Sequence, residues 1–281
     1  MPGQPEHADA ATTQLAAVAL EAARAAASVI RAAAPRVRDI VWQEKKAKDF
    51  VSEVDLAAEA TIIAVVRQRV PHATFLAEET ASSISPEMLE AGLVFVVDPL
   101  DGTTNFLHGY PEYAVSVGVL QGGTLRAGVV IDVPLGEVFT ATEGGGAFRD
   151  GTPIHVSPID KPGRALFGTG FPFRRVEDIA PYLLQLDRVM RGASGVRRAG
   201  AAALDLAAVA CGRYEGFWEP RLSPWDIAAG LLLVREAGGV ATTFSGEPCP
   251  VAHTSIAAGS PAMHRWLLGQ LHGETGEGRR P

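Results

Sequence analysis

The stretch FVVDPLDGTTNF, residues 95–106, is the most informative part of the sequence, because it joins a buried strand directly to a group of acids and hydroxyls. The apolar residues before Asp98 are typical of a buried strand, and Pro99 prevents the hydrogen-bonded ladder from continuing. We therefore expect Asp98 and Asp101 to project together from the carboxyl end of this strand. Two carboxylates held close together repel each other unless a cation lies between them.

The polar residues of this run have the chemistry of a metal and phosphate site. Carboxylate oxygens suit Mg²⁺ or Mn²⁺, and the backbone carbonyl of Leu100 offers a third oxygen between the two acids. Gly102 permits a close backbone turn. If the N–H groups of Gly102 and Thr103 open a short helix, they form an anion site beside the metal.

Charge and composition exclude several classes of protein. The 281 residues suffice for a substantial core, and a formal net charge of −7 argues against a general binder of nucleic acid or anionic membranes. The arginine pairs 174–175 and 197–198 are therefore interpreted as surface or interface charge. Two cysteines are compatible with a reducing cytoplasm. Because no segment resembles a signal peptide or a transmembrane helix, we expect a cytoplasmic protein with no membrane and no nucleic-acid partner.

Periodicity and turn residues predict the order of the elements. The Ala-rich stretch after residue 14 indicates a long amphipathic helix. The first half is expected to continue with a helix over 56–70 and strands over 74–77, 113–120, 124–132 and 137–142. From residue 165 strands alternate with helices, which are expected over 178–191, 201–211 and 224–237. The glycines 144–146 are interpreted as a turn, because no Lys-Ser or Lys-Thr follows them.

The acidic run resembles the inositol monophosphatases, which are lithium-sensitive, Mg²⁺-dependent phosphatases of the wider fructose-bisphosphatase-like fold. Other stretches fit the family in the same order, and the similarity spans roughly residues 18–268. These stretches are DFVSEVD (49–55), Glu78-Glu79, GEVFTATEGGGAF (136–148) and WDIAAG (225–230). The resemblance implies an α/β (α+β) chain with the layered αβαβα sugar-phosphatase fold. We expect the active site between an N-terminal half, 1–145, and a C-terminal half, 146–270, followed by a flexible tail, 271–281.

The resemblance also implies a set of metal ligands. Glu78, Asp98 and the Leu100 carbonyl would hold a first Mg²⁺, while Asp98, Asp101 and Asp226 would share a second. Two or three Mg²⁺ ions per subunit are expected, and Mn²⁺ is expected to substitute. In such sites a pair of ions stabilises both the attacking and the leaving oxygen.

By the same resemblance, Glu78, Thr103 and Asp55 are the catalytic residues. Glu78 and Thr103 would orient a metal-activated water, and Asp55 would hydrogen-bond the threonine. Direct attack by water is expected because the core motif holds no Cys or His near its acids to form a phospho-enzyme. The phosphate would be bound by Asp101, Gly102 and Thr103.

Residues on the alcohol side of the substrate are Gly200, Ala202 and Glu219, again by resemblance. The expected reaction is hydrolysis of inositol 1-phosphate, a small phosphorylated polyol, to inositol and phosphate by a homodimer. Ala201 stands where many relatives carry Thr or Ser, so strict specificity for inositol is left open. Thr104-Asn105 resembles the inositol branch more than its sister branches.

Other interpretations remain open at this point. Asp98 or Asp101 alone is typical of a turn, and Asp226 alone is typical of the first turn of a helix. A sister phosphatase, acting on histidinol phosphate, fructose 1,6-bisphosphate or 3′-phosphoadenosine 5′-phosphate, would need the same metal core. A catalytically idle binding or scaffold protein is disfavoured, because a scaffold has no need of clustered acids.

Overall fold

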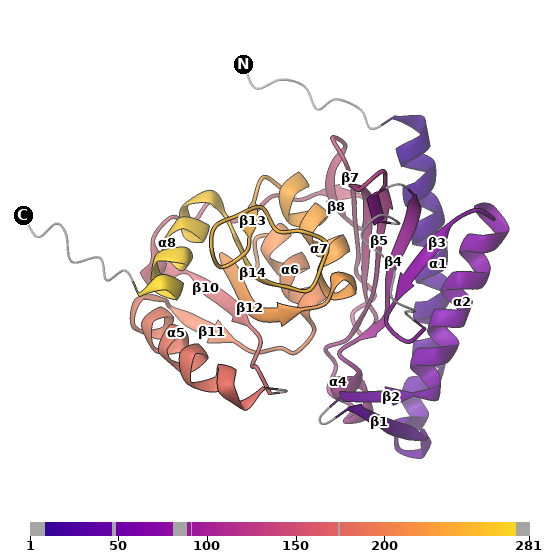
Figure 1. The fold of residues 1–281 in the computed structure, drawn as a ribbon, viewed down its shortest axis with the longest axis horizontal. Helices are drawn as coiled ribbons and strands as arrows, with labels where there is room; N and C mark the ends of the chain where they lie inside the picture. Colours follow the sequence, from indigo (N-terminus) through magenta and orange to yellow (C-terminus); the bar gives the residue numbers. More distant parts are fainter. Residues whose placement is uncertain (1–8, 47–48, 81–88, 91, 174, 274–281) are drawn as a thin grey trace, which may run out of the picture.

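The computed structural model describes residues 9–46, 49–80, 89–90, 92–173 and 175–273, and Figure 1 shows them as alternating layers of helices and sheets. Two helices cover the outer face of a seven-stranded sheet, two lie between this sheet and a five-stranded sheet, and two cover the far side. In that order they are α1 (Ala10–Ala33) with α2 (Glu53–Arg69), α6 (Ala202–Ala210) with α7 (Pro224–Glu236), and α5 (Ile179–Gly192) with α8 (Pro261–His272). The expected αβαβα layering is thereby confirmed.

The seven-stranded sheet is antiparallel except at one edge, where β3 runs parallel to β4. Its strands, in spatial order, are β3 (Thr74–Ala77), β4 (Leu93–Asp101), β5 (Ala114–Gln121), β6 (Thr124–Asp132), β7 (Val138–Thr142), β8 (Gly146–Arg149) and β9 (Thr152–Pro153). The glycines 144–146 lie at the tight β7–β8 hairpin, which confirms the predicted turn.

The five-stranded sheet has β10 parallel to both of its neighbours, and β14 antiparallel to both of its own. Its strands, in spatial order, are β11 (Gly195–Arg197), β10 (Leu166–Thr169), β12 (Gly216–Leu222), β14 (Thr254–Gly259) and β13 (Val240–Thr242). The short elements elsewhere are η1 (Ala34–Asp39), the hairpin β1 (Trp42–Lys46) and β2 (Asp49–Ser52), α4 (Thr103–Leu107), η2 (Pro162–Arg164) and η3 (Val176–Asp178).

The predicted elements agree with the structure to within a few residues. The strands over 74–77 and 124–132 have the expected bounds. Helix α2 begins at Glu53 rather than at residue 56, because Ser52 and Asp55 form a capping box that adds a turn. The first sheet continues to Pro153, and the division into halves at residue 145 stays a prediction. Most of the expected tail, 274–281, lies outside the described residues.

Helix α7 packs unusually close to the seven-stranded sheet. A Cβ added to Gly118 of β5 would lie 2.6 Å from the Cβ of Ala228, and one added to Gly128 of β6 would lie 2.8 Å from the carbonyl oxygen of Ala229. Small residues on both surfaces therefore set the height of α7 above the sheet. No helix in the described part of the chain is long and apolar enough to cross a membrane.

Replacing Gly118 with alanine is expected to destabilise the fold by about 1–3 kcal/mol, because α7 must move away from the sheet. Urea unfolding followed by circular dichroism measures this change. Gly269→Ala is the matched control, since Gly269 lies in α8 with open space around it, and alanine there favours the helix. Equal stability of the two variants would contradict the close packing.

Candidate functional site

The ends of two parallel strands bring Glu78 beside Asp98. Ala77 of β3 is in register with Val97 of β4, and the N–H of Glu78 donates to the carbonyl of Val97 at 3.1 Å. Glu78 directly follows Ala77, and Asp98 directly follows Val97. The structure therefore brings together the first two acids of the predicted ligand set.

Strand β4 continues beyond Pro99, which differs from the expected end of the ladder. Asp98 faces Ser116 of β5, the register then shifts, and pairing resumes at Asp101. Within this bulge the N–H of Leu100 donates to Oδ1 of Asp98 at 3.1 Å. Pro99 thus interrupts the ladder without ending the strand. The bulge places Pro99 and Leu100 between the two acids.

Thr103 and Asp55 form the hydrogen bond that the sequence predicted. Oγ1 of Thr103 lies 2.8 Å from Oδ1 of Asp55 and 3.0 Å from the carbonyl oxygen of Leu100. The other oxygen of Asp55 accepts from the N–H of Ser52 at 2.9 Å in the capping box of α2. Gly102 precedes Thr103 with a φ of 89°, a conformation that favours glycine.

Asp226 and Asp101 each accept a hydrogen bond from the start of a helix. Asp226 belongs to the first turn of α7 and accepts from the N–H of Ser223 at 2.6 Å. Asp101 accepts from the N–H of Ala203 at 2.8 Å, in the first turn of α6. Because Ala201 provides no side-chain cap for α6, the acid of β4 supplies one from the other sheet layer.

Burial and mutual repulsion raise the pKa values of these acids. Asp98 is 2% exposed, and burial followed by the charges of Glu78, Asp101 and Asp226 raises its pKa well above the ordinary value. A hydrogen bond between the carboxyl groups of Asp98 and Glu78 adds to this rise, and such a bond requires a proton on one of them. Burial is also the main reason that the pKa of Asp101 rises to about 7.

The donor set has the chemistry of a divalent metal centre. Four carboxylates and one carbonyl are hard oxygen ligands of the kind that Mg²⁺ takes, and a bound cation would remove the repulsion that now raises their pKa values. Among the residues that the structure describes, no three acidic, His or Cys side chains already stand in an arrangement that would hold an ion.

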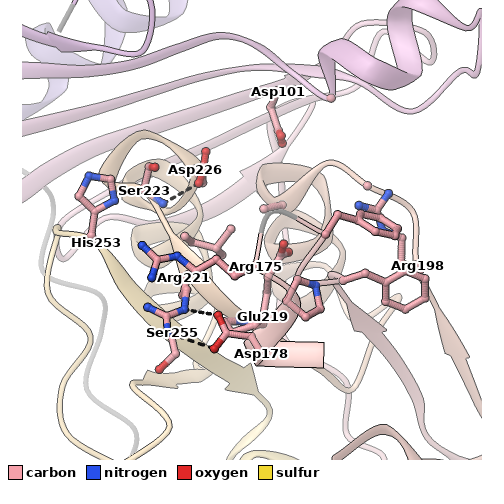
Figure 2. A pocket seen from close by; sticks show the side chains of 18 of the residues that line it. Asp101, Arg175, Asp178, Arg198, Glu219, Arg221, Ser223, Asp226, His253 and Ser255 are labelled. Carbon is pink, nitrogen blue, oxygen red and sulfur yellow. Dashed lines mark hydrogen bonds and ion pairs between the residues drawn. The ribbon is translucent and has the colours of Figure 1, made fainter. Parts of the chain in front are cut away.

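The acids lie at one end of a solvent-open cleft with a volume of about 1490 Å³. Figure 2 shows Asp101 and Asp226 at this end, with Glu219, Arg221 and Asp178 further along the cleft. This volume exceeds the roughly 300–1,000 Å³ that is usual for a small-molecule site.

On the substrate side of the cleft, two positions leave no room for a Cβ and therefore require glycine. A Cβ on Gly170 would lie 1.8 Å from Cδ of Glu219, so the side chain of Glu219 passes directly over that glycine. Gly200 has a φ of 97°, and a Cβ there would lie 2.3 Å from Nη1 of Arg198. Ala202 lines the same cleft.

Several residues of the cleft were not identified from the sequence. Asn105 joins α4 to the loop before α6, because its Nδ2 donates to the carbonyls of Glu112 at 2.7 Å and Ala199 at 3.1 Å. Arg175 and Arg198, which were interpreted as surface or interface charge, line the cleft, while residue 174 lies outside the described residues. The guanidinium carbon of Arg198 lies 5.5 Å and 5.1 Å from the ring centres of two phenylalanines, Phe171 and Phe173. The phenylalanines and Arg198 are separated along the chain by η3, α5 and β11, so their packing leaves no local pattern in the sequence.

Comparison with known proteins gives similarity over nearly the whole chain. A model of the inositol monophosphatase family matches residues 11–275. Nus factor SuhB of Pseudomonas aeruginosa is 44% identical over 253 residues, which cover 89% of this chain and 93% of that protein. The crystal structure of extragenic suppressor protein suhB from Bartonella henselae has a TM-score of 0.87 at 38% identity, covering 92% of this chain and 98% of the other. Inositol monophosphatase from Anabaena has a TM-score of 0.81 at 35% identity, covering 93% and 96%.

The raised pKa values predict how the metal-free protein responds to pH. Between about pH 4 and pH 7 the folded state holds protons on Asp98 and Asp101 that the unfolded chain has lost. The free energy of unfolding therefore falls as pH rises through this interval. In the presence of chelator, the melting temperature is expected to be lower by several degrees at about pH 8 than at about pH 5.

Thermal unfolding followed by circular dichroism tests this prediction with and without Mg²⁺. Added Mg²⁺ should raise the melting temperature more at the higher pH, and Asp98→Asn should make the pH dependence of the chelated protein shallower. A melting temperature that rises with pH in chelator would show that folding does not raise the pKa values of these acids.

Proposed function

The chain belongs to the inositol monophosphatase family, and from this premise we propose that it is a Mg²⁺-dependent phosphomonoesterase that hydrolyses inositol 1-phosphate to inositol and phosphate. The observation that carries the proposal is the group of acids at one end of the cleft, which raise one another's pKa and lie beside a hydroxyl held by a further buried acid. Fold alone would not support an activity, because one fold serves many functions.

The proposed metal ligands are Glu78, Asp98, Asp101, Asp226 and the Leu100 carbonyl, which would hold two or three Mg²⁺ ions. When bound, such ions lower the pKa of water and offset the charge of the phosphoryl group.

The chain itself positions the other reactants. Asp55 holds the hydroxyl of Thr103 at 2.8 Å, so this hydroxyl has a fixed direction beside the acids. Thr103 and Glu78 would orient the attacking water by hydrogen bonds, and the Glu78 carboxylate would receive its proton. The backbone N–H groups of Gly102 and Thr103, with Asp101 beside them, would hold the phosphate oxygens in line for displacement.

Glu219 is the proposed contact for the hydroxyl groups of the alcohol, together with the backbone at Gly200 and Ala202. All three line the cleft with the acids. Gly170→Ala should displace the Glu219 side chain, because the new Cβ would occupy its position. We expect this variant to change the ranking of polyol phosphates in the same way as Glu219→Gln, with about a tenfold loss of kcat/KM on the polyol esters.

The measurement is phosphate release from polyol phosphates and from an aryl phosphate that lacks ring hydroxyls. Hydrolysis of the aryl phosphate should fall much less than hydrolysis of the polyol esters. Equal losses on all esters would reject the role of Glu219 in selecting the alcohol.

The proposed activity is tested by phosphate release from inositol 1-phosphate, with histidinol phosphate and 3′-phosphoadenosine 5′-phosphate as the alternatives. Release should require Mg²⁺, stop with chelator, and be fastest on inositol 1-phosphate. Asp98→Asn should lower kcat by at least about a thousandfold, since it removes a charge shared by both proposed ions.

Asp132→Asn is the matched control for this variant. Asp132 is also buried, and burial raises its pKa, but it lies at the end of β6 outside the cleft. Loss of activity in both variants would point to a general effect of the substitution. Absence of phosphate release from every ester would favour a binding or scaffold protein.

A second candidate function is a role in a transcription complex. The name Nus factor, carried by the relative from Pseudomonas aeruginosa, implies contact with RNA polymerase or nucleic acid and conflicts in part with the expectation of no nucleic-acid partner. The structure offers an apolar surface for a protein partner or a second copy, formed by exposed side chains of η3 and α5. These side chains are Val176, Ile179, Leu183, Leu184 and Met190. Homodimer formation, lithium sensitivity and a cytoplasmic location remain proposals from the family.

A further inference from the structure

Helix α2 buries two acids on the face that packs against α1 and the seven-stranded sheet (Figure 1). The buried positions of α2 recur every three to four residues, and most of them are apolar, among them Ala58, Ile62 and Val66. Asp55 and Glu59 lie on the same face, and each is only 1% exposed. A buried carboxylate costs free energy unless hydrogen bonds offset the loss of water. These two acids therefore serve something other than packing.

The two acids hold two groups of the candidate site. Asp55 and Glu59 are four residues apart, so their side chains lie one above the other on the helix. Asp55 accepts from the hydroxyl of Thr103 at 2.8 Å. Glu59 accepts through Oε2 from the N–H of Glu79 at 2.8 Å, and Glu79 directly follows Glu78. One helix therefore contacts both groups that are proposed to orient the attacking water, Thr103 directly and Glu78 through the next peptide.

The bond from Glu59 completes the anchoring of the backbone at Glu78. On one side, the N–H of Glu78 donates to the carbonyl of Val97 at 3.1 Å. On the other side, the N–H of Glu79 donates to Glu59. Strand β3 ends at Ala77, so this second peptide lies beyond the hydrogen-bonded ladder. Because both peptides that flank the α-carbon of Glu78 are held, its side chain leaves the backbone in a fixed direction.

The second oxygen of Glu59 indicates that an acid at this position does not serve stability. Its Oε1 is buried, and no donor in the described ranges forms a hydrogen bond with it. A buried polar atom without a partner lowers the stability of the fold. An apolar side chain of similar length would fill this position without that cost. The hydrogen bond to Glu79 is what an acid provides here and an apolar residue does not.

We propose that Glu59 is a positioning residue of the metal centre, because it holds the peptide after Glu78 and so keeps the Glu78 carboxylate in the direction needed to bind a divalent cation. This inference rests on the proposed metal-dependent function and adds a residue outside the predicted ligand set. Together with Asp55, one turn earlier, Glu59 fixes the position of Glu78 relative to Thr103. Removal of a partner that orients a metal ligand typically weakens metal binding by about 10- to 100-fold.

Three variants of Glu59 separate its hydrogen bond from its charge. Glu59→Gln loses the charge but keeps an oxygen that accepts from the Glu79 N–H. Glu59→Asp keeps the charge but is shorter by a methylene group, which withdraws the carboxylate from this N–H. Glu59→Met keeps the length of the side chain and loses both the charge and the acceptor.

The measurement is calorimetric titration of Mg²⁺ into each chelator-stripped protein, without substrate. Glu59→Gln should keep the Kd of the wild type within about twofold, whereas Glu59→Asp and Glu59→Met should raise it by at least about tenfold. Thermal unfolding in chelator controls for a general loss of structure. Glu59→Met should melt no earlier than Glu59→Gln, because it buries no oxygen without a partner. If Glu59→Met does not fold, the comparison of Glu59→Gln with Glu59→Asp decides alone.

Two results would overturn the proposal. Equal Mg²⁺ affinity in Glu59→Gln and Glu59→Asp would show that the hydrogen bond has no effect, and a loss in Glu59→Gln alone would assign the effect to charge. A loss confined to variants that melt earlier than Glu59→Gln would equally reject a positioning role.

A failure of the proposed activity is distinguishable from a failure of this inference, because the titration needs no turnover. A wild-type chain that binds Mg²⁺ but hydrolyses no ester would reject the phosphatase proposal, and the ranking of the Glu59 variants would still decide the inference. A wild-type chain that binds no Mg²⁺ would reject both.

Discussion

Buried carboxylates at the ends of β3 and β4 repel one another, and this repulsion constrains both the fold and its candidate site. Three other acids lie close enough to Asp98 for their charges to raise the free energy of its ionised form. Burial raises this free energy further. In the metal-free protein the raised pKa values of Asp98 and Asp101 reduce this cost, because a protonated acid carries no charge. A divalent cation would reduce it further, which links the stability of the fold to the chemistry that we propose.

The α6–α7 layer meets the end of the seven-stranded sheet at this cluster, and three kinds of close contact join them there. Asp101 of the first sheet layer caps α6, Asn105 donates to the loop before α6, and α7 brings Asp226 against the sheet through the glycines of β5 and β6. The acids therefore come from separate elements whose spacing depends on close packing. A small change in the height of α7 would move one proposed ligand relative to the others.

Much of this arrangement could be predicted from the sequence, because it follows from local patterns. The strand before Asp98, the hydroxyl at Thr103 and the small residues after Trp225 stand in short motifs that resemble a family. The predicted start of α2, residue 56, is late by about one turn, although Ser52 and Asp55 have the spacing of a capping box. The Arg221–Asp178 pair could not be foreseen, since its members are 43 residues apart and the left-handed backbone has no glycine to indicate it.

The most direct test of the account is calorimetric titration of Mg²⁺ into the chelator-stripped protein near pH 7, in buffers with different enthalpies of ionisation. The acid cluster binds protons at this pH because the pKa of Asp101 is about 7 and that of Asp98 is raised. Mg²⁺ must displace these protons, so the account predicts binding with proton release, and less release in Asp98→Asn. Binding without proton release, or no binding of Mg²⁺ at millimolar concentration, would contradict it.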